Sequence, residues 1–349
     1  MTDLEERVRV QVPAPVRKSR HIALVLLGAV IILALSYVLP PFRNYQLATV
    51  GAYLCVTAGL TVLTGLNGQL SLGHGALMAV GAYTLALTQN SLAGNGLGQW
   101  TLLVAVLAAI VVTTVAGAVV GLAAARLRGP YLAGLTLAVA VVVPAITSTW
   151  DGTFNSDQGL SVAVDPPPVA LGYDFPYERW QAWLTWAGAL LTLLLLANLV
   201  RSRFGRDLTA VRDDETAARL AGVNVARTQV LAFVVSAACA GLGGALIAVL
   251  SQSVSPGAFP LALSLFLLMA IVIGGLGRLS GALWGAVLLV VLPAVTHSIT
   301  DSIDVSPALA QRLEGNLPLA IFGVVLIVVM LAFPGGIASL PSRIRRRRR

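Results

Sequence analysis

Charged residues are scarce in this chain. Asp, Glu, Lys and Arg make up 11% of its 349 residues, whereas a soluble domain has roughly 25%. Hydrophobic residues reach 57%, and the mean hydropathy is +0.85. Several apolar runs have about 18 residues or more, enough to cross the ~30 Å hydrocarbon core of a bilayer. The shortage of charge therefore excludes a soluble domain and predicts an all-α, polytopic integral membrane protein.

Cysteine is nearly absent as well. Cys55 and Cys239 both fall inside predicted helices, which argues against a disulfide framework and against a metal cluster. Residues 1–20 lack the apolar core of a signal peptide. The first apolar run, 22–39, is long for such a core and has no small-residue cleavage site. We therefore interpret it as a retained helix.

The sequence also lacks the motifs of catalysis. It contains no GxxxxGK[ST] phosphate loop, so the chain does not bind ATP in the usual cradle. HExxH, GxSxG and paired intramembrane carboxylates are missing too. These absences predict no catalytic residues, no metal site and no cofactor on this chain, which is then not an enzyme. If ATP drives the protein, ATP and magnesium must bind to a separate ATPase subunit.

Ten apolar stretches predict about ten transmembrane helices (8–10). Their ranges are 22–39, 46–64, 70–89, 101–125, 131–149, 182–200, 229–250, 261–276, 281–299 and 317–333. The link between the second and third is tight and rich in glycine. A broken or re-entrant segment there stays open, because irregular backbone is tolerated in a membrane where protein or a water-filled cavity covers it.

The basic residues test this layout independently. With the N-terminus inside and ten crossings, only three of the 23 Lys and Arg residues fall outside, as the positive-inside rule requires. The three exceptions are Arg43, Arg179 and Arg312. Both termini are therefore predicted to be cytoplasmic. The basic run Arg345–Arg349 is interpreted as an anchor that touches anionic lipid, not as a nucleic-acid site.

This topology divides the chain into three parts. Residues 1–21 form a cytoplasmic arm, 22–335 the transmembrane domain and 336–349 a basic cytoplasmic tail. Two long connections lie within the domain: an extracellular loop at 150–181 and a cytoplasmic loop at 201–228. The extracellular loop carries several aromatic residues, which commonly mark the membrane interface.

A polar run follows the second predicted helix. Residues 65–83 read GLNGQLSLGHGALMAVGAY and combine five glycines with polar side chains, which are costly in a bilayer. Candidates for lining a translocation pathway are Asn67, Gln69, Ser71, His74 and, further along, Thr136. Hydrogen bonding between helices, without solute contact, is the alternative. A proton relay through the histidine would need further charged groups in the spans, and none is present.

The cytoplasmic loop contains Phe204–Arg227, the only long charged segment between two apolar spans. Acidic residues before a short helix at about 215–221 would stabilise its amino end, and Gly222 is placed to end it. Ala217, Ala218 and Ala221 would give the helix a small, smooth face. The candidate coupling residues are Arg212, Asp213, Asp214, Glu215, Ala217, Ala218, Gly222 and Asn224. An ordinary solvated loop is the alternative.

Four motifs carry a family resemblance. They are GQLSLGHGALMAVGAY (68–83), RGPYLAGLTLA (128–138), FNSDQGL (154–160) and DDETAARLAGVN (213–224). Together they resemble the permease subunits of branched-chain amino acid ABC importers, which are inner-membrane components of binding-protein-dependent transport systems. Urea-importing relatives share the first motif. The resemblance runs from about residue 45 to 335, nearly the whole chain.

The resemblance implies a permease fold in the cell membrane that moves branched-chain amino acids inward by alternating access. It also implies partners: ATPase subunits docked on 204–227, a second permease subunit in a homodimer or heterodimer, an extracellular solute-binding protein, and membrane lipid. An importer of urea or another small amide or amino acid is an alternative. So is an ion-coupled secondary transporter, although it would need intramembrane acidic residues that the sequence lacks.

One short sequence pattern occurs twice in the chain. GRLSGALWG (277–285) repeats the GxLS pattern of GQLSLGHGAL (68–77) six helices later. Transporters often contain internal repeats, so the pattern suggests a duplication.

Overall fold

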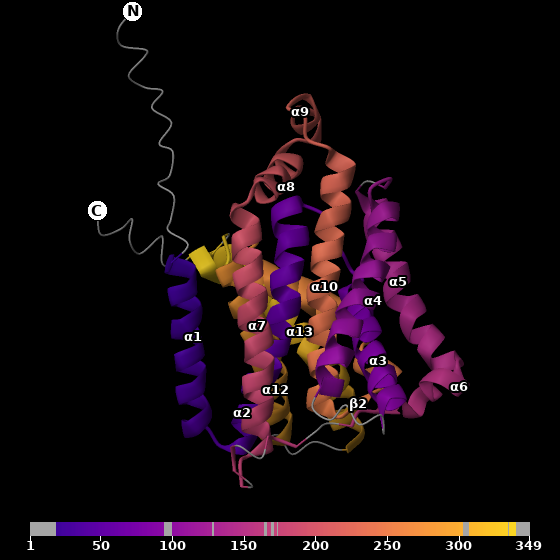
Figure 1. Cartoon of the computed structure of the whole chain (residues 1–349), viewed down its shortest axis with the longest axis vertical. Helices are drawn as coiled ribbons and strands as arrows, with labels where there is room; N and C mark the ends of the chain where they lie inside the picture. The colour runs from indigo at the N-terminus through magenta and orange to yellow at the C-terminus, as the bar shows by residue number, and fades with distance from the viewer. Residues whose placement is uncertain are drawn as a thin grey trace, which may run out of the picture.

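The computed structural model describes residues 19–93, 100–127, 129–163, 166–168, 171–172, 174–302, 307–333 and 335–339. Most of the predicted cytoplasmic arm and most of the basic tail lie outside these residues. Figure 1 shows the described part as a bundle of long helices.

Ten helices of 14 residues or more make up the described part of the bundle. They are α1 Ser19–Val38, α2 Pro41–Leu60, α3 His74–Leu92, α4 Trp100–Ala124, α5 Pro130–Thr149, α7 Tyr177–Arg201, α10 Val225–Ser251, α11 Leu261–Gly274, α12 Leu279–Ser302 and α13 Pro307–Ala332. Each corresponds to one predicted range. Eight segments within this part are long and apolar enough to cross a membrane, so the chain is a multi-pass membrane protein, with the predicted count of ten remaining approximate.

Short elements occupy the connections. They are the π-helix Thr61–Leu66, α6 Asp151–Phe154, α8 Arg203–Asp213, α9 Glu215–Leu220, the 3₁₀ turns Ser156–Gln158, Pro256–Ala258 and Ile337–Ser339, and strands β1 Leu160–Ser161 and β2 Ser253–Val254. The two strands pair antiparallel, with Leu160 opposite Val254. This small ribbon is a departure from the predicted all-helical chain.

Five predicted helix starts differ from the observed starts by four residues or more, and two of them have a clear physical reason. The third helix begins at His74, not at 70, because the preceding residues form an irregular segment around Gly68, whose φ is +75°. The last helix begins at Pro307, ten residues before the predicted start. Proline is favoured in the first helical turn, and the hydrophilic residues that follow it continue the helix beyond the apolar run.

Helix α10 occupies the centre of the bundle and packs against α2, α3 and α4. Small residues make this possible, because they let helix backbones approach closely. Gly81 of α3 faces the backbone of Gly241 on α10, and a Cβ added at Gly81 would lie 2.6 Å from the Gly241 Cα. Gly117 of α4 faces Ala237 in the same way. Glycines of α3, α4 and α10 therefore set how closely these helices approach one another.

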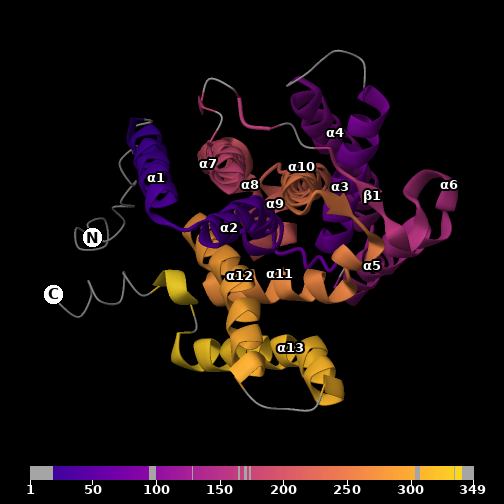
Figure 2. The ribbon, with the colours of Figure 1, turned by 90° about the horizontal axis from the view of Figure 1, so that it is seen from below.

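The other helices surround this centre, as Figure 2 shows. Helix α2 packs between α7 and α10, and α1 stands at the edge against α7. Helices α11, α12 and α13 form a second group on the other side of α2 and α3. The outer faces of α1 and α4 are apolar and exposed, with Val111 and Val115 about 60% exposed, as lipid contact requires.

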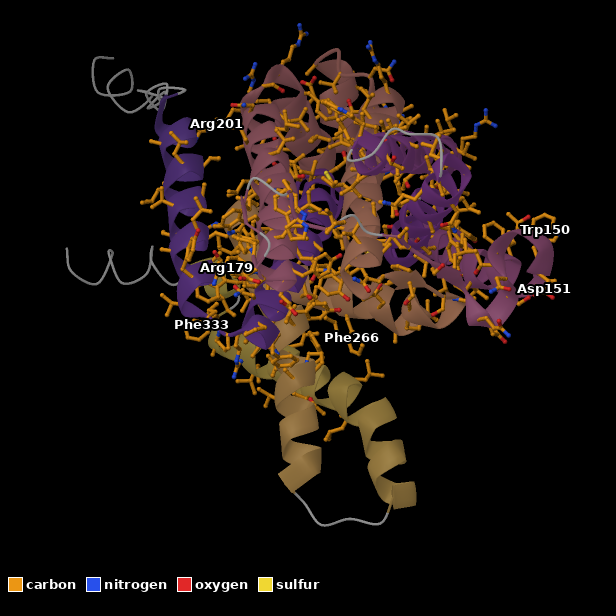
Figure 3. All side chains as sticks on the ribbon, turned by 60° about the horizontal axis from the view of Figure 1, so that its bottom comes forward. Trp150, Asp151, Arg179, Arg201, Phe266 and Phe333 are labelled. Carbon is orange, nitrogen blue, oxygen red and sulfur yellow. The ribbon has the colours of Figure 1, made fainter. Side chains whose placement is uncertain are left out.

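The two ends of the bundle differ in character. Helices α8 and α9 extend beyond the ends of α7 and α10 (Figure 1). In Figure 3, Arg201 marks this end of α7 and Arg179 the opposite end, while Trp150 and Asp151 mark the corner between α5 and α6. The start of α1, the end of α7 and the start of α12 line one common groove. The starts of α1 and α12 therefore lie on the same side as α8 and α9.

Candidate functional site

The candidate site begins where α2 changes its helical form. After Leu60 the chain continues as a π-helix to Leu66, a form found mostly as short segments at functional positions. The backbone N–H of Asn67 donates to the Val62 carbonyl, and the backbone N–H of Gln69 donates to the Leu63 carbonyl at 3.3 Å. The following residues, up to Gly73, are irregular; Gln69, Ser71 and Gly73 are buried, whereas Gly68 and Leu70 are exposed. The break that the sequence left open is present, and it is covered by protein.

His74 is fully buried at the start of α3, held between two serines. Its Nδ1 lies 2.9 Å from the Ser71 Oγ, and its Nε2 lies 2.6 Å from the Ser236 Oγ on α10. Thr136 of α5 is also buried, and its Oγ1 accepts from the Leu72 amide at 3.0 Å. The structure thus brings three of the five pathway candidates together in a network that joins α3, α5 and α10.

The other two pathway candidates are buried but only partly satisfied. Asn67 is 3% exposed, and neither its Oδ1 nor its Nδ2 has a hydrogen-bond partner among the described residues. Gln69 is 6% exposed, and its Oε1 is unpartnered within the same part of the chain. A buried polar group without a partner costs about 1–3 kcal/mol. These two amide side chains and the Tyr83 hydroxyl are therefore the polar groups of the described run with unused bonding capacity.

At the other part of the site, α9 forms the predicted short helix. Asp214 is its N-cap, and its Oδ1 accepts from the Thr216 and Ala217 amides at 2.7 and 3.0 Å. These bonds, the Ala217 bond first, hold the pKa of the Asp214 carboxyl below its usual range. The acidic amino end that the sequence suggested is a true cap, because its carboxylate satisfies two amides at the start of the helix.

The carboxyl end of α9 closes as a Schellman motif. The Gly222 amide donates to the Arg219 carbonyl and the Val223 amide to the Ala218 carbonyl, both at 2.9 Å. Gly222 has a φ of +83°, the left-handed conformation that favours glycine. Its predicted place at the end of the helix is confirmed.

The predicted small, exposed face of α9 was wrong for one of its three alanines. Ala218 is buried in a small cluster with Val211 of α8 and Val225 of α10, so it fastens α9 to its own chain. The face that remains exposed carries Leu220, which is 86% exposed. The sequence pattern did not predict that Leu220 is exposed, because its exposure depends on how α8 and α10 pack against α9.

Polar contacts add to this fastening. The Gln229 Nε2 donates to the Glu215 Oε1 at 3.0 Å, which joins α9 to α10. Asn224 caps α10, and its Oδ1 accepts from the Arg227 amide at 3.0 Å. Asp213 is exposed and pairs with Arg212 at 2.8 Å. All eight predicted coupling residues therefore lie on or beside α9, in a segment that is helical rather than a loose solvated loop.

A hydrogen bond connects the two parts of the site directly. The Arg212 Nη1, at the end of α8, donates to the Gly65 carbonyl of the π-helix at 3.0 Å. Sequence reasoning placed Arg212 in the charged loop and Gly65 in the polar run, but did not link them. It also missed Ser236 and Ser264, which bond His74 and the Gly75 amide from α10 and α11. These partners lie more than 140 positions away in the chain.

The opposite end of the bundle carries a separate, structural cluster. The Arg179 Nε donates to the Ser36 carbonyl at 3.0 Å, and its guanidinium lies 4.4 Å from the centre of the Tyr37 ring. The Trp183 Nε1 donates to the Ser36 Oγ at 2.9 Å. These contacts pin α1 to α7. They account for Arg179, one of the three basic residues expected outside.

Comparison with known proteins places the chain among permeases. The profile of the family described as "Branched-chain amino acid transport system / permease component" matches residues 44–334. The permease protein LivM of Salmonella typhimurium is 34% identical over 262 residues, and LivM of Escherichia coli is 33% identical over 262 residues. Each alignment covers 68% of this chain and 60% of the relative.

A second type of relative matches at lower identity. The permease protein LivH of Escherichia coli is 27% identical over 304 residues, which cover 83% of this chain and 92% of LivH. LivM and LivH are named as permease proteins of a high-affinity branched-chain amino acid transport system. No solved structure matches the chain.

Proposed function

This chain belongs to the branched-chain amino acid transport system permease family, and from that premise we propose that it is the membrane-spanning permease subunit of an ATP-driven importer. Its substrates are branched-chain amino acids, which cross the cell membrane by alternating access. ATP and magnesium bind to separate ATPase subunits. The chain supplies the passage and the surface on which those subunits dock.

The observation that carries this proposal is the form of α9. It is a six-residue helix at one end of the bundle, fixed underneath by Ala218 and Glu215 and open on the side of Leu220. The helix is capped at both ends and projects beyond the spans, a form that suits a groove of another protein, and Leu220, 86% exposed, is an apolar side chain that it offers there.

The polar run supports the transport step. Asn67 and Gln69 have unused hydrogen-bonding groups close to the π-helix, and the described spans hold no acidic residue beside them. Neutral amide groups suit the passage of a zwitterionic solute, because they offer donors and acceptors without a fixed counter-ion. We assign these two residues to the pathway, and the Ser71–His74–Ser236 network to holding α3 against α10.

The remaining partners follow from the same proposal. A second permease subunit, identical or related, completes the passage, and a solute-binding protein delivers the amino acid to the extracellular loop at 150–181. Both termini are cytoplasmic. This topology places α8 and α9 in the compartment that contains ATP.

Transport assays in proteoliposomes test the proposal. The chain is reconstituted with its candidate ATPase, second permease and binding protein, and uptake of labelled leucine and of labelled urea is measured with and without ATP. Leucine uptake that requires ATP is expected. ATP-independent uptake by the chain alone would establish a secondary transporter instead, and ATP-dependent uptake of urea but not leucine would replace the substrate class.

A further inference from the structure

Arg212 occupies the junction between the docking helix and the broken helix. Its Nη1 donates to the Gly65 carbonyl at 3.0 Å, while its Nε and Nη2 donate to the Asp213 Oδ1 at 3.0 and 2.8 Å. One guanidinium therefore bridges the N-terminal side of α9 and the end of the π-helix. Carbonyls at the end of a helix lack intrahelical donors and favour a cation, so the contact suits both partners.

Two glycines lie against the Arg212 side chain. A Cβ added at Gly68 would lie 2.9 Å from the Arg212 Cγ, and Gly68 has a φ of +75°. Gly277, in the turn between α11 and α12, lies against Gly65, and a Cβ there would be 3.7 Å from the Arg212 Nη1. The two GxLS turns of the sequence thus come together at one arginine. Three segments from distant parts of the chain meet at this point.

Arg212 links α9 to the polar run over a short stretch of chain. Arg212 stands two residues before the cap Asp214, and Gly65 stands two residues before Asn67. A displacement of α9 pulls on a bonded guanidinium, and the guanidinium pulls on the backbone that carries Asn67 and Gln69. Packing of Ala218 on Val211 of α8 and Val225 of α10 holds α9 to the two helices that flank it.

We propose that Arg212 is the positioning residue that transmits movement of the ATPase-docking helix to the π-helix and its polar run. The inference rests on the proposed function, because it assumes that α9 receives the ATPase. It assigns to Arg212 a role in coupling, distinct from binding the partner. Loss of the Gly65 contact should leave the ATPase docked and active while its hydrolysis no longer moves solute.

The test measures how much leucine is transported per ATP hydrolysed by the reconstituted complex. Arg212→Gln should lower this ratio about tenfold or more, because a hydrogen bond from a charged group is lost. The ATPase subunits should co-purify in the wild-type proportion, and ATP hydrolysis should continue. Arg206→Gln is the matched control, since Arg206 is an exposed arginine on the same helix and its removal should leave the ratio unchanged.

A second pair of variants approaches the contact from the other side. Gly68→Ala leaves Arg212 in place but pushes its side chain, and it should lower the same ratio. Gly129→Ala controls for backbone strain, because Gly129 also has a positive φ, +56°, with nothing within 4 Å of an added Cβ. Arg212→Lys keeps the charge but cannot bridge two acceptors as a planar fork. If the Arg212→Gln complex does not assemble, Arg212→Lys replaces it in the measurement and should lower the same ratio.

The outcomes distinguish failure of the proposed transport function from failure of the coupling role of Arg212. If the wild-type complex shows no ATP-driven uptake of leucine, the proposed function fails. If it does, and the ratio is unchanged in Arg212→Gln and Gly68→Ala, only the coupling role of Arg212 is overturned. Loss of the ATPase subunits from the Arg212 variants but not from Arg206→Gln would also overturn it, because Arg212 would then serve docking.

Discussion

At the start of α3, buried polar groups depend on serine hydroxyls from other segments of the chain. His74 is fully buried, and each of its ring nitrogens faces a serine. The Gly75 amide, one residue later, donates to the Ser264 Oγ at 2.9 Å. Because the bilayer offers no water to replace such partners, each hydroxyl holds the start of α3 in place. The serines of α10 and α11 therefore belong to the site as much as the polar run does.

Removal of one hydroxyl tests this dependence. Ser236→Ala should lower the free energy of unfolding by about 1 kcal/mol, the scale of a hydrogen bond between membrane helices. Thermal unfolding in detergent measures the effect. Ser148→Ala is the control, since the Ser148 hydroxyl is exposed and donates to a carbonyl of its own helix. Equal stability of the two variants would contradict the role of Ser236.

The cap at Asp214 predicts a pH dependence. Its folded pKa is lowered, so the cap contributes fully above the usual range of a carboxyl group and is lost as the pH falls through the lowered value. Hydrogen exchange of the Thr216 and Ala217 amides should therefore accelerate only at acidic pH, after correction for the intrinsic rate. Asp214→Asn should keep the cap without this dependence, and Asp214→Ala should lose protection at every pH. Equal protection in all three proteins would refute the cap.

Among the elements, α9 is too short to be stable alone, because helices below about 12–15 residues are marginal in water. Its conformation comes from a cap at each end and from Ala218 packed on α8 and α10. The result is a rigid projection rather than a flexible loop. Rigidity matters for the proposed function, since a soft element would absorb a displacement instead of passing it on.

Gly222 provides the test of this rigidity. Gly222→Ala places a Cβ at a φ of +83°, where nothing lies within 4 Å, so the change acts through backbone strain of about 1–2 kcal/mol. Faster hydrogen exchange across α9 and reduced ATP-driven uptake are expected. Gly222→Pro should abolish uptake without preventing membrane insertion. Gly257→Ala is the control, because Gly257 is equally open without a positive φ; matching behaviour of the two alanine variants would argue against the role of the Schellman turn.

The contact between α3 and α10 requires a close approach of the two helix backbones. At Gly81 an added Cβ would meet the Gly241 backbone, which cannot rotate away as a side chain can. Gly81→Ala should therefore separate the helices and lower the yield of folded protein and its melting temperature. Gly134→Ala in α5 has open space around its Cβ and should behave as wild type. A normal melting temperature for Gly81→Ala would show that the contact has room to relax.

At the scale of the whole molecule, the bundle has two chemically distinct ends. The α9 end presents Leu220, and the α5–α6 corner at the other end presents Trp150, which is 65% exposed. The proposed topology puts these residues on opposite sides of the membrane. The two native cysteines, Cys55 and Cys239, are buried, so added cysteines can report on sidedness against a silent background.

Labelling of single added cysteines tests the topology. A membrane-impermeant maleimide should label Trp150→Cys in intact cells. It should label Leu220→Cys only in inside-out vesicles. The wild-type protein is the control and should remain unlabelled in both. Labelling of Leu220→Cys in intact cells would reverse the proposed orientation.

Much of this architecture could be predicted from sequence, because apolar runs of membrane length record the helices directly. The cap at Asp214 and the turn at Gly222 also leave local signals. Other features have no local signal: Ser236 pairs with His74 across 162 positions, and Arg212 meets Gly65 across 147. The exposure of Leu220 and the burial of Ala218 depend on which face of α9 meets α8 and α10. That choice is made only when the helices pack.

The central position of α10 has a consequence for the order of synthesis. Helices α2, α3 and α4 all pack against it, yet it is made after them, and ends at Ser251. At roughly 5–20 residues per second, the glycine-lined faces of these helices wait on the order of ten seconds for their common partner. During that interval lipid or an insertion factor must cover them. The ribosome thus delivers the central helix only after three of the helices that pack against it.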